Sequence, residues 1–214
     1  TDRALTQSHA AVRSRLRGTR GRAPLHAPHR RPAGRRPHDR SWWQDGILYQ
    51  VYPRSFADAD GDGHGDLRGL RARLGHLARL GVSGLWLNPT CPSADADWGY
   101  DVTGYCDVHP DFGTLEDMDA LLADAHAAGI RVLLDLVPNH TSDRHPWFQE
   151  SRSSRDNPKA DWYVWSDTDE LYRDARIIFV DTEPSNWTWD PIRGQYYWHR
   201  FFHHQPDLNF ENPE

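Results

Sequence analysis

The chain has 214 residues, of which 37% are hydrophobic and 26% are charged, and its formal net charge is -6. This length and composition allow one sizeable domain with a packed core. No run approaches the ~20 consecutive apolar residues that cross a bilayer, and the N-terminus lacks the apolar core of a secretory signal. We therefore expect a cytoplasmic protein with no membrane segment.

The chain has two cysteines, Cys91 and Cys106. Such a low count excludes a disulfide scaffold and fits a reducing compartment, although one bridge between the two thiols stays open as an alternative.

Residues 1–40 differ sharply in charge from the rest of the chain. They contain eleven Arg against Asp2 and Asp39, a net charge of +9, which leaves -15 for residues 41–214. The segment is rich in Arg and Pro and poor in apolar residues, so it predicts a disordered extension. A nucleic-acid-binding arm is the alternative. Because no aromatic residue lies in the segment to stack on bases, we expect no nucleic-acid partner.

Three apolar runs after residue 41 predict β-strands. They cover residues 46–53, 84–89 and 130–140, and each is short, continuous and rich in aliphatic residues. Runs of this kind, without polar alternation, are typical of strands that are buried on both faces of a parallel sheet.

Two helices are expected between these strands. Residues 67–81 place leucines at helical spacing before Gly81. Residues 114–129 open with Thr114 as N-cap, followed by Asp117 three positions later, and end at Gly129. Both segments combine an apolar stripe with a glycine stop.

The order strand, helix, strand, helix, strand predicts an α/β fold with parallel βα units, as a closed barrel or an open sheet. Polar residues follow each strand, at the edge where such folds place their chemistry. Residues 141–214 are irregular and rich in Trp, Pro and Asp, which indicates a functional subdomain.

The stretch "DADGDGHGD" suggests a metal site. Asp58, Asp60, Asp62 and Asp66 occupy positions 1, 3, 5 and 9 of an EF-hand-like loop, and the carbonyl of His64 falls at position 7. Position 12 is glycine instead of the usual glutamate. Clustered carboxylates repel each other unless a cation holds them, so we expect a structural Ca²⁺, with a solvated acidic turn as the alternative.

Several ordered motifs carry a resemblance to a known family, over residues 42–214. The chain contains "YQVYPRSFADADGDGHGDLRG", "GLWLNP", "WGYDVTGY", "DLVPNHTSDRHPWFQESRSS" and "QPDLN". In this order they resemble the N-terminal part of the α-amylase superfamily, glycoside hydrolase family 13. "QPDLN" is similar to the oligo-1,6-glucosidase branch, and the segment that contains it looks most like trehalose synthases, which isomerise maltose to trehalose.

The resemblance implies the first three βα units of a (β/α)8 TIM barrel in residues 41–140, with a B subdomain after the third strand in residues 141–214. It implies that Tyr100 stacks on a glucose ring, that Asp101 binds its hydroxyls, and that His140 binds its 6-hydroxyl. The aspartate loop matches the calcium loop of the family. Asn139 and Asp207 match a second calcium site.

The resemblance also implies a retaining enzyme that acts on maltose or short α-glucosides. Such enzymes use a carboxylate nucleophile and an acid about 5 Å apart, which in this family follow the fourth and fifth strands. No residue matches either, so we expect both beyond Glu214 and expect the 214-residue chain alone to be inactive. An α-glucosidase is the alternative, and a non-catalytic sugar-binding relative is the alternative of another class. The sequence does not indicate an oligomeric state.

Overall fold

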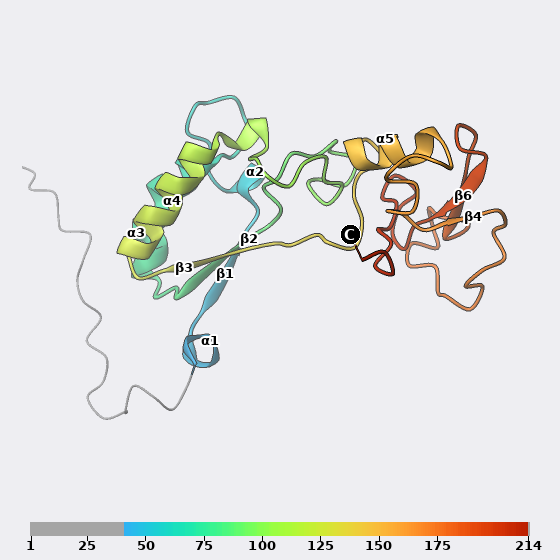
Figure 1. The fold of residues 1–214 in the computed structure, drawn as a ribbon. Helices are drawn as coiled ribbons and strands as arrows, with labels where there is room; N and C mark the ends of the chain where they lie inside the picture. The colour runs from blue at the N-terminus through green and yellow to red at the C-terminus, as the bar shows by residue number, and fades with distance from the viewer. Residues whose placement is uncertain (1–40, 214) are drawn as a thin grey trace, which may run out of the picture. The chain divides into compact units, whose positions relative to one another are not determined.

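The structure is a computed structural model that describes residues 41–213 (Figure 1). The predicted Arg-rich extension, residues 1–40, lies outside the described residues.

Three parallel strands form the first sheet, as expected. They are β1 (Leu48–Val51), β2 (Gly84–Leu87) and β3 (Arg131–Leu134), paired in the order β1-β2-β3. The register aligns their last residues, because Val51 pairs with Leu87 and Leu87 pairs with Leu134. The carboxyl ends of all three strands therefore meet at one edge of the sheet.

Two long helices connect these strands, also as expected. Helix α3 covers Leu67–Arg79 and α4 covers Leu115–Ala127. The predicted capping box at Thr114 and Asp117 forms at the start of α4. Gly81 and Gly129 follow the two helices with φ of +80° and +74°, a conformation that glycine adopts without the steric cost of a Cβ.

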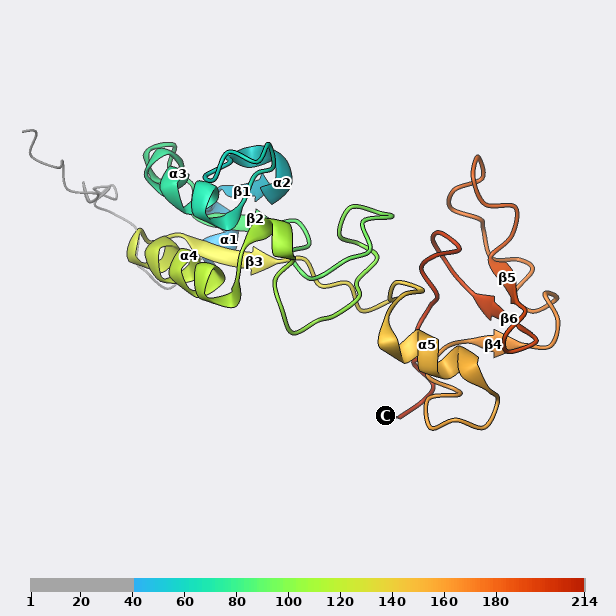
Figure 2. The ribbon, with the colours of Figure 1, turned by 90° about the horizontal axis from the view of Figure 1, so that it is seen from above.

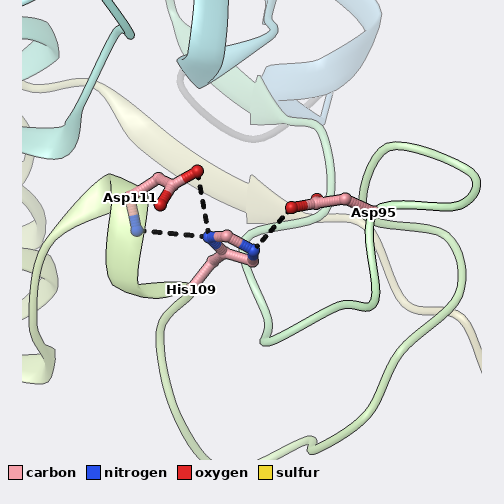
Figure 3. Close-up of side chains that lie close together, drawn as sticks. All are labelled: Asp95, His109 and Asp111. Carbon is pink, nitrogen blue, oxygen red and sulfur yellow. Dashed lines mark hydrogen bonds and ion pairs between the residues drawn. The ribbon is translucent and has the colours of Figure 1, made fainter. Parts of the chain in front are cut away.

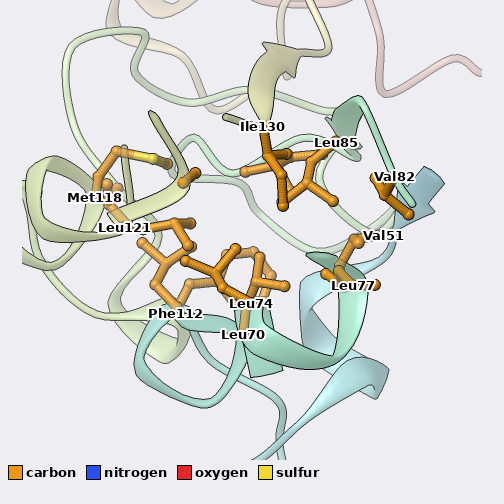
Figure 4. Close-up of a cluster of buried hydrophobic side chains, with 14 residues drawn as sticks. Val51, Leu70, Leu74, Leu77, Val82, Leu85, Phe112, Met118, Leu121 and Ile130 are labelled. Carbon is orange, nitrogen blue, oxygen red and sulfur yellow. The ribbon is translucent and has the colours of Figure 1, made fainter. Parts of the chain in front are cut away.

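The main hydrophobic core lies between the sheet and α3 and α4, which run side by side (Figures 1 and 4). Leu70 and Leu77 of α3, Leu85 of β2 and Leu121 of α4 are fully buried in it. Burial of each such side chain contributes about 1.5–3 kcal/mol, so these leucines fix the two helices on the sheet.

The opposite face of the sheet differs from the expectation of strands buried on both faces. Leu48, Trp86 and Leu133 point to this face and are 45%, 40% and 36% exposed. The reason is that α3 and α4 cover one face only.

Short helices complete this part of the described chain. They are α1 (Trp42–Asp45), α2 (Pro53–Phe56) and the 3-10 helix η1 (Pro110–Phe112). Helix α2 follows β1 directly and leads into the aspartate loop.

Residues 141–213 are more regular than the sequence suggested. They contain α5 (Pro146–Ser153) and an antiparallel sheet of β4 (Trp165–Ser166), β6 (Gln195–Trp198) and β5 (Trp187–Asp190), in that order (Figure 2). Phe148, Tyr163 and Tyr197 form a second core beside this sheet. Several of the aromatic residues in the segment that the sequence predicted to be irregular are thus strand residues.

No helix among residues 41–213 is long and apolar enough to cross a membrane. Cys91 and Cys106 are both free thiols.

Candidate sugar-binding site

A chain of hydrogen bonds joins the carboxyl ends of the three parallel strands. Gln50 Nε2 of β1 donates to Asn88 Oδ1 (3.0 Å), and Asn88 Nδ2 donates to the Tyr100 hydroxyl (3.2 Å). That hydroxyl donates to Asp135 Oδ2 (2.8 Å), while Trp86 Nε1 donates to Asp135 Oδ1 (2.7 Å). The three strand ends thus hold the Tyr100 ring in one orientation.

Tyr100 is neither an acid nor a base at neutral pH. Burial and the hydrogen bond to Asp135 raise the pKa of the Tyr100 hydroxyl to about 12. The phenol therefore stays neutral, and its ring is available for packing against a ligand.

Tyr100 borders a pocket of about 500 Å³ at this edge. The pocket is lined by Tyr52, Arg54, Ser55, Asn88, Asp97, Trp98 and Tyr100. The lining combines aromatic rings with a few polar groups, which is typical of sites for small polar ligands.

Asp97, which sequence reasoning missed, also lines this pocket, and its Oδ2 accepts a hydrogen bond from Gln205 Nε2 (2.8 Å). The Tyr100 amide donates to the Asp97 carbonyl (3.0 Å), and the two residues between them, Trp98 and Gly99, have φ of +50° and +106°. This tight turn places Asp97 and Tyr100 on the same pocket. The signal in the sequence was the Asp-x-Gly-Tyr order, which is typical of a turn.

Asp101, the carboxylate that was expected to bind sugar hydroxyls, lies elsewhere. It is fully buried and does not line the pocket. Its oxygens accept hydrogen bonds from the Ser93 hydroxyl (2.7 Å) and from the amides of Ala96 (3.1 Å) and Asp97 (2.9 Å). These bonds hold the turn that carries Asp97 and Tyr100.

His140 lies next to the same turn. It is 4% exposed, and its Nε2 is 3.0 Å from the Tyr100 carbonyl oxygen, whereas its Nδ1 is 3.2 Å from Asn139 Nδ2. Because a carbonyl only accepts, Nε2 carries the proton and Nδ1 accepts from the amide. Burial lowers the pKa of His140, so the ring is neutral at pH 7.

The structure brings together Asn139 and Asp207, the two residues expected at a second calcium site. Asn139 Nδ2 donates to Asp207 Oδ1 (3.0 Å) across 68 positions of sequence. Asp207 is 7% exposed, and burial raises the pKa of its carboxyl to about 7. Both residues border a larger concavity of about 730 Å³ beside β4 and β6.

In the aspartate loop, three of the four predicted carboxylates converge. Oxygens of Asp58, Asp60 and Asp66 lie within 4.8 Å of one another. The carboxylate of Asp62 is not in this group; it accepts from the His64 amide (2.7 Å). Asp66 is also the N-cap of α3, since its Oδ1 accepts from the Gly69 amide (2.6 Å).

The electrostatics of this loop favour charged carboxylates. The amides of Gly61 and Gly63 donate to Asp58 and lower the pKa of its carboxyl. Ca²⁺ takes oxygen ligands, about 6–8 of them. The three carboxylates are of the right chemical type for the expected ion and would supply part of this set.

A second cluster of residues that could bind a metal consists of Asp95, His109 and Asp111 (Figure 3). His109 Nε2 is 3.2 Å from Asp95 Oδ2, and the Asp111 amide donates to His109 Nδ1 (3.2 Å). Arg54 lies against both carboxylates, with NH2 at 3.2 Å from Asp95 Oδ1 and NH1 at 2.7 Å from Asp111 Oδ2. Because the guanidinium already supplies the positive charge, we interpret this cluster as an ion-pair network.

Comparisons with known proteins show the family of this chain. The profile described as "Alpha amylase, catalytic domain" matches residues 50–214. The trehalose synthase of Pimelobacter sp. (strain R48) is 61% identical over 173 residues, which is 81% of this chain and 30% of the relative. A probable alpha-glucosidase of Rhizobium meliloti (strain 1021) is 56% identical over 176 residues, covering 82% of this chain and 32% of the relative. The oligo-1,6-glucosidase of Parageobacillus thermoglucosidasius is 46% identical over 178 residues, 82% of this chain and 31% of the relative.

Solved structures match as well. A crystal structure of a MutB mutant in complex with the substrate sucrose has a TM-score of 0.76 and 44% identity, and the match covers 82% of this chain and 31% of that one. The alpha-glucosyl transfer enzyme XgtA has a TM-score of 0.75 and 47% identity, covering 81% and 32%. This chain thus spans about 30% of the length of the curated relatives that it matches. The fold is of the TIM-barrel type, and the chain belongs to the family of alpha-amylase catalytic domains.

Proposed function

We propose that this chain forms the glucose-binding part of a retaining enzyme that acts on maltose or short α-glucosides, with trehalose synthase activity as the leading candidate. The observation that carries the proposal is the pairing of Asp97 and Tyr100 on one pocket at the carboxyl ends of the parallel strands. This is the edge at which TIM-barrel enzymes bind their substrates. The 61% identity to a trehalose synthase supports the choice of substrate.

In this proposal each residue of the pocket has a binding role. The neutral ring of Tyr100 packs against the apolar face of a glucose unit, and Asp97 and Asn88 accept from or donate to its hydroxyls. His140 holds the turn through the Tyr100 carbonyl, and its contact with the 6-hydroxyl stays a prediction. Asp101 positions Asp97, and its contact with sugar hydroxyls stays a prediction.

The chemical step needs a nucleophile and an acid that we assign to no residue among those described. Glucosyl transfer with retention requires two carboxyl groups about 5 Å apart on opposite sides of the scissile bond. The contribution of the described residues is therefore to bind and orient the glucose unit. We expect the 214-residue chain alone to bind sugar without turning it over.

The finer architecture and the ions belong to the same proposal. We assign β1–β3 with their helices to the first three units of the barrel, and residues 141–213 to a B subdomain. Asp58, Asp60 and Asp66 would hold a structural Ca²⁺, and Asn139 with Asp207 would hold a second one. The two free cysteines support a cytoplasmic location.

Calorimetric titration of the chain with maltose and methyl α-glucoside tests the binding site. Tyr100→Ala and Asp97→Asn should each weaken binding by about tenfold, which corresponds to about 1.4 kcal/mol. Tyr100→Phe keeps the ring and should retain most of the affinity. Asp119→Asn, on the exposed face of α4, is the matched control and should bind like the parent chain. Parent-like affinity in both Tyr100→Ala and Asp97→Asn would exclude this pocket.

An α-glucosidase is the second candidate, favoured by the 56% identity to a probable alpha-glucosidase. The two candidates differ in whether the glucosyl group is passed to water or to a sugar hydroxyl. Product analysis of the complete enzyme on maltose separates them, because glucose as the sole product would exclude the isomerase. Turnover of maltose by the 214-residue chain would contradict the assignment of a purely binding role.

A further inference from the structure

We propose that Trp98 is a stacking platform for a pyranose ring in the same pocket, and that it sets the affinity of the site for α-glucosides. The inference rests on the proposed function, which it deepens, because it gives a role to Trp98, the first residue of the motif "WGYDVTGY", for which the resemblance implied none.

Trp98 combines a position on the pocket with high exposure. Its side chain lines the pocket together with Asp97, Tyr100 and Asn88. It is 61% exposed, although large aromatic side chains are usually buried for most of their surface. The indole is therefore accessible from the pocket, in contrast to that of Trp187, which is 6% exposed.

The indole is supported from one side by a fixed cation. The Arg54 guanidinium carbon lies 5.9 Å from the centre of the Trp98 ring. Arg54 is itself held by Asp95 and Asp111, so it cannot swing away without breaking two ion pairs. This support keeps the indole at the pocket although little else covers it.

The backbone of Trp98 indicates that the side chain is kept for a reason other than local conformation. Its φ is +50°, a left-handed conformation that is uncommon for a bulky residue and suits glycine. Strain of this kind persists at functional sites where the side chain gives a compensating benefit. Here the left-handed turn is what points Asp97 and Tyr100 to the same pocket as the indole.

The ligand class follows from the groups around the indole. A pyranose ring offers a flat apolar face of C–H groups and a rim of hydroxyls. The Trp98 ring matches the face, and Asp97 and Asn88, which line the same pocket, are the partners for the rim.

Three substitutions at this position separate stacking from support of the fold. Trp98→Gly removes the ring and relieves the left-handed strain, Trp98→Leu keeps apolar volume without a flat face, and Trp98→Phe keeps a smaller flat face. Trp43→Leu is the matched control, because Trp43 is 59% exposed and lies outside the pocket.

Calorimetric titration with maltose and methyl α-glucoside, with melting temperatures of all variants, is the test. We expect Trp98→Gly and Trp98→Leu to weaken binding of at least one of the two sugars about tenfold, with Trp98→Phe intermediate and Trp43→Leu unchanged. Trp98→Gly should melt no lower than the parent chain, since glycine fits the backbone. Affinity that falls without loss of stability is a result that a structural role does not give.

Two outcomes overturn the inference, and they are distinguishable. In the first outcome, the parent chain binds sugar and Tyr100→Ala weakens this binding, but Trp98→Gly and Trp98→Leu bind both sugars like the parent chain. The proposed function then stands, and the role of Trp98 as a stacking platform is refuted. If the parent chain binds neither sugar, the proposed function and the platform fail together.

Discussion

Removal of the Arg54 guanidinium should destabilise the loop that carries the pocket. Arg54 is in α2, and its side chain is 12% exposed. It bonds Asp95 and Asp111, which flank the segment that contains Tyr100, and its guanidinium carbon lies 5.1 Å from the ring of Phe112. In Arg54→Gln both carboxylates lose their charged partner and the aromatic ring loses its cation.

The size of the effect follows from these contacts. A hydrogen bond to a charged group contributes about 1.5–3 kcal/mol in partly buried surroundings. The two carboxylates are 36% and 40% exposed, so water screens part of each ion pair and both values must be reduced. We therefore expect Arg54→Gln to lower the free energy of unfolding by about 2–3 kcal/mol, and Arg54→Lys, which keeps the charge but loses the planar fork, by about half of that.

Arg71→Gln is the matched control, because Arg71 makes a single ion pair with Asp124 and both partners are about half exposed. Exposed pairs of this kind contribute about 0–1 kcal/mol. Urea unfolding followed by circular dichroism measures both variants under the same conditions. Equal losses in Arg54→Gln and Arg71→Gln would refute the view that the Arg54 network holds the loop.

Three further predictions concern the ion, acid stability and the core. If Ca²⁺ binds where three carboxylates converge, Asp60→Asn should abolish most of the rise in melting temperature on adding Ca²⁺, and Asp62→Asn should keep it; the reverse result would mean that the converged oxygens are not the ligands. Burial lowers the pKa of His145 from its ordinary 6.5 to about 4. Between pH 6.5 and pH 4 the unfolded chain therefore binds a proton that the folded chain does not bind, so the free energy of unfolding decreases as the pH is lowered through this window. The chain should lose about 1–2 kcal/mol from pH 7 to pH 5, and His145→Asn, which keeps an acceptor at the N-cap of α5, should lose less; equal losses in urea unfolding would contradict this. In urea unfolding, Leu77→Ala should lower the free energy of unfolding by about 2–5 kcal/mol, because Leu77 is fully buried. Leu80, which directly follows the same helix, is 53% exposed, so Leu80→Ala should lower it by less than about 1 kcal/mol. Similar losses in the two variants would contradict the core described here.

The elements that sequence reasoning predicted are those with a local physical signature. Helix α4 begins at the predicted capping box of Thr114 and Asp117 and is followed by Gly129 in a left-handed conformation. The parallel strands appeared because runs of aliphatic residues alternated with these helices. In contrast, β5 and β6 were missed, since each has only four residues and lies in a stretch rich in turn residues. The hairpin between them depends on a tight turn from Asp190 to Gly194, whose amide donates to the Asp190 carbonyl (2.8 Å).

The site was harder to predict because it depends on a turn and not on a regular element. Tyr100 was predicted, and it does lie on the pocket. The resemblance gave Asp101 a role in binding sugar hydroxyls, and this role stays a prediction, because Asp101 is buried, accepts three hydrogen bonds and does not line the pocket. Asp97 reaches the pocket through the left-handed conformations of Trp98 and Gly99; the Asp-x-Gly-Tyr order indicates such a turn, but not which side chains the turn brings to the pocket.

The aspartate loop and the pocket are connected through α2. The Gly65 amide donates to the Arg54 carbonyl (2.6 Å) and the Asp66 amide donates to the Ala57 carbonyl (2.9 Å), so the end of the loop closes onto this short helix. A Cβ at Gly65 would lie 2.1 Å from the Pro53 carbonyl oxygen, which shows how closely the two backbones approach.

Because the side chain of Arg54 leaves the same helix toward Asp95 and Asp111, an ion in the aspartate loop and the order of the pocket loop should be coupled. A double-mutant cycle with Asp60→Asn and Arg54→Gln measures this coupling as the free energy of sugar binding in the presence of Ca²⁺. If α2 carries the effect, the two changes will be non-additive, since either one releases the helix from one of its two supports. Additive losses would instead mean that the loop and Arg54 act on the pocket independently, whereas unchanged sugar binding in Asp60→Asn would mean that the loop does not act on the pocket.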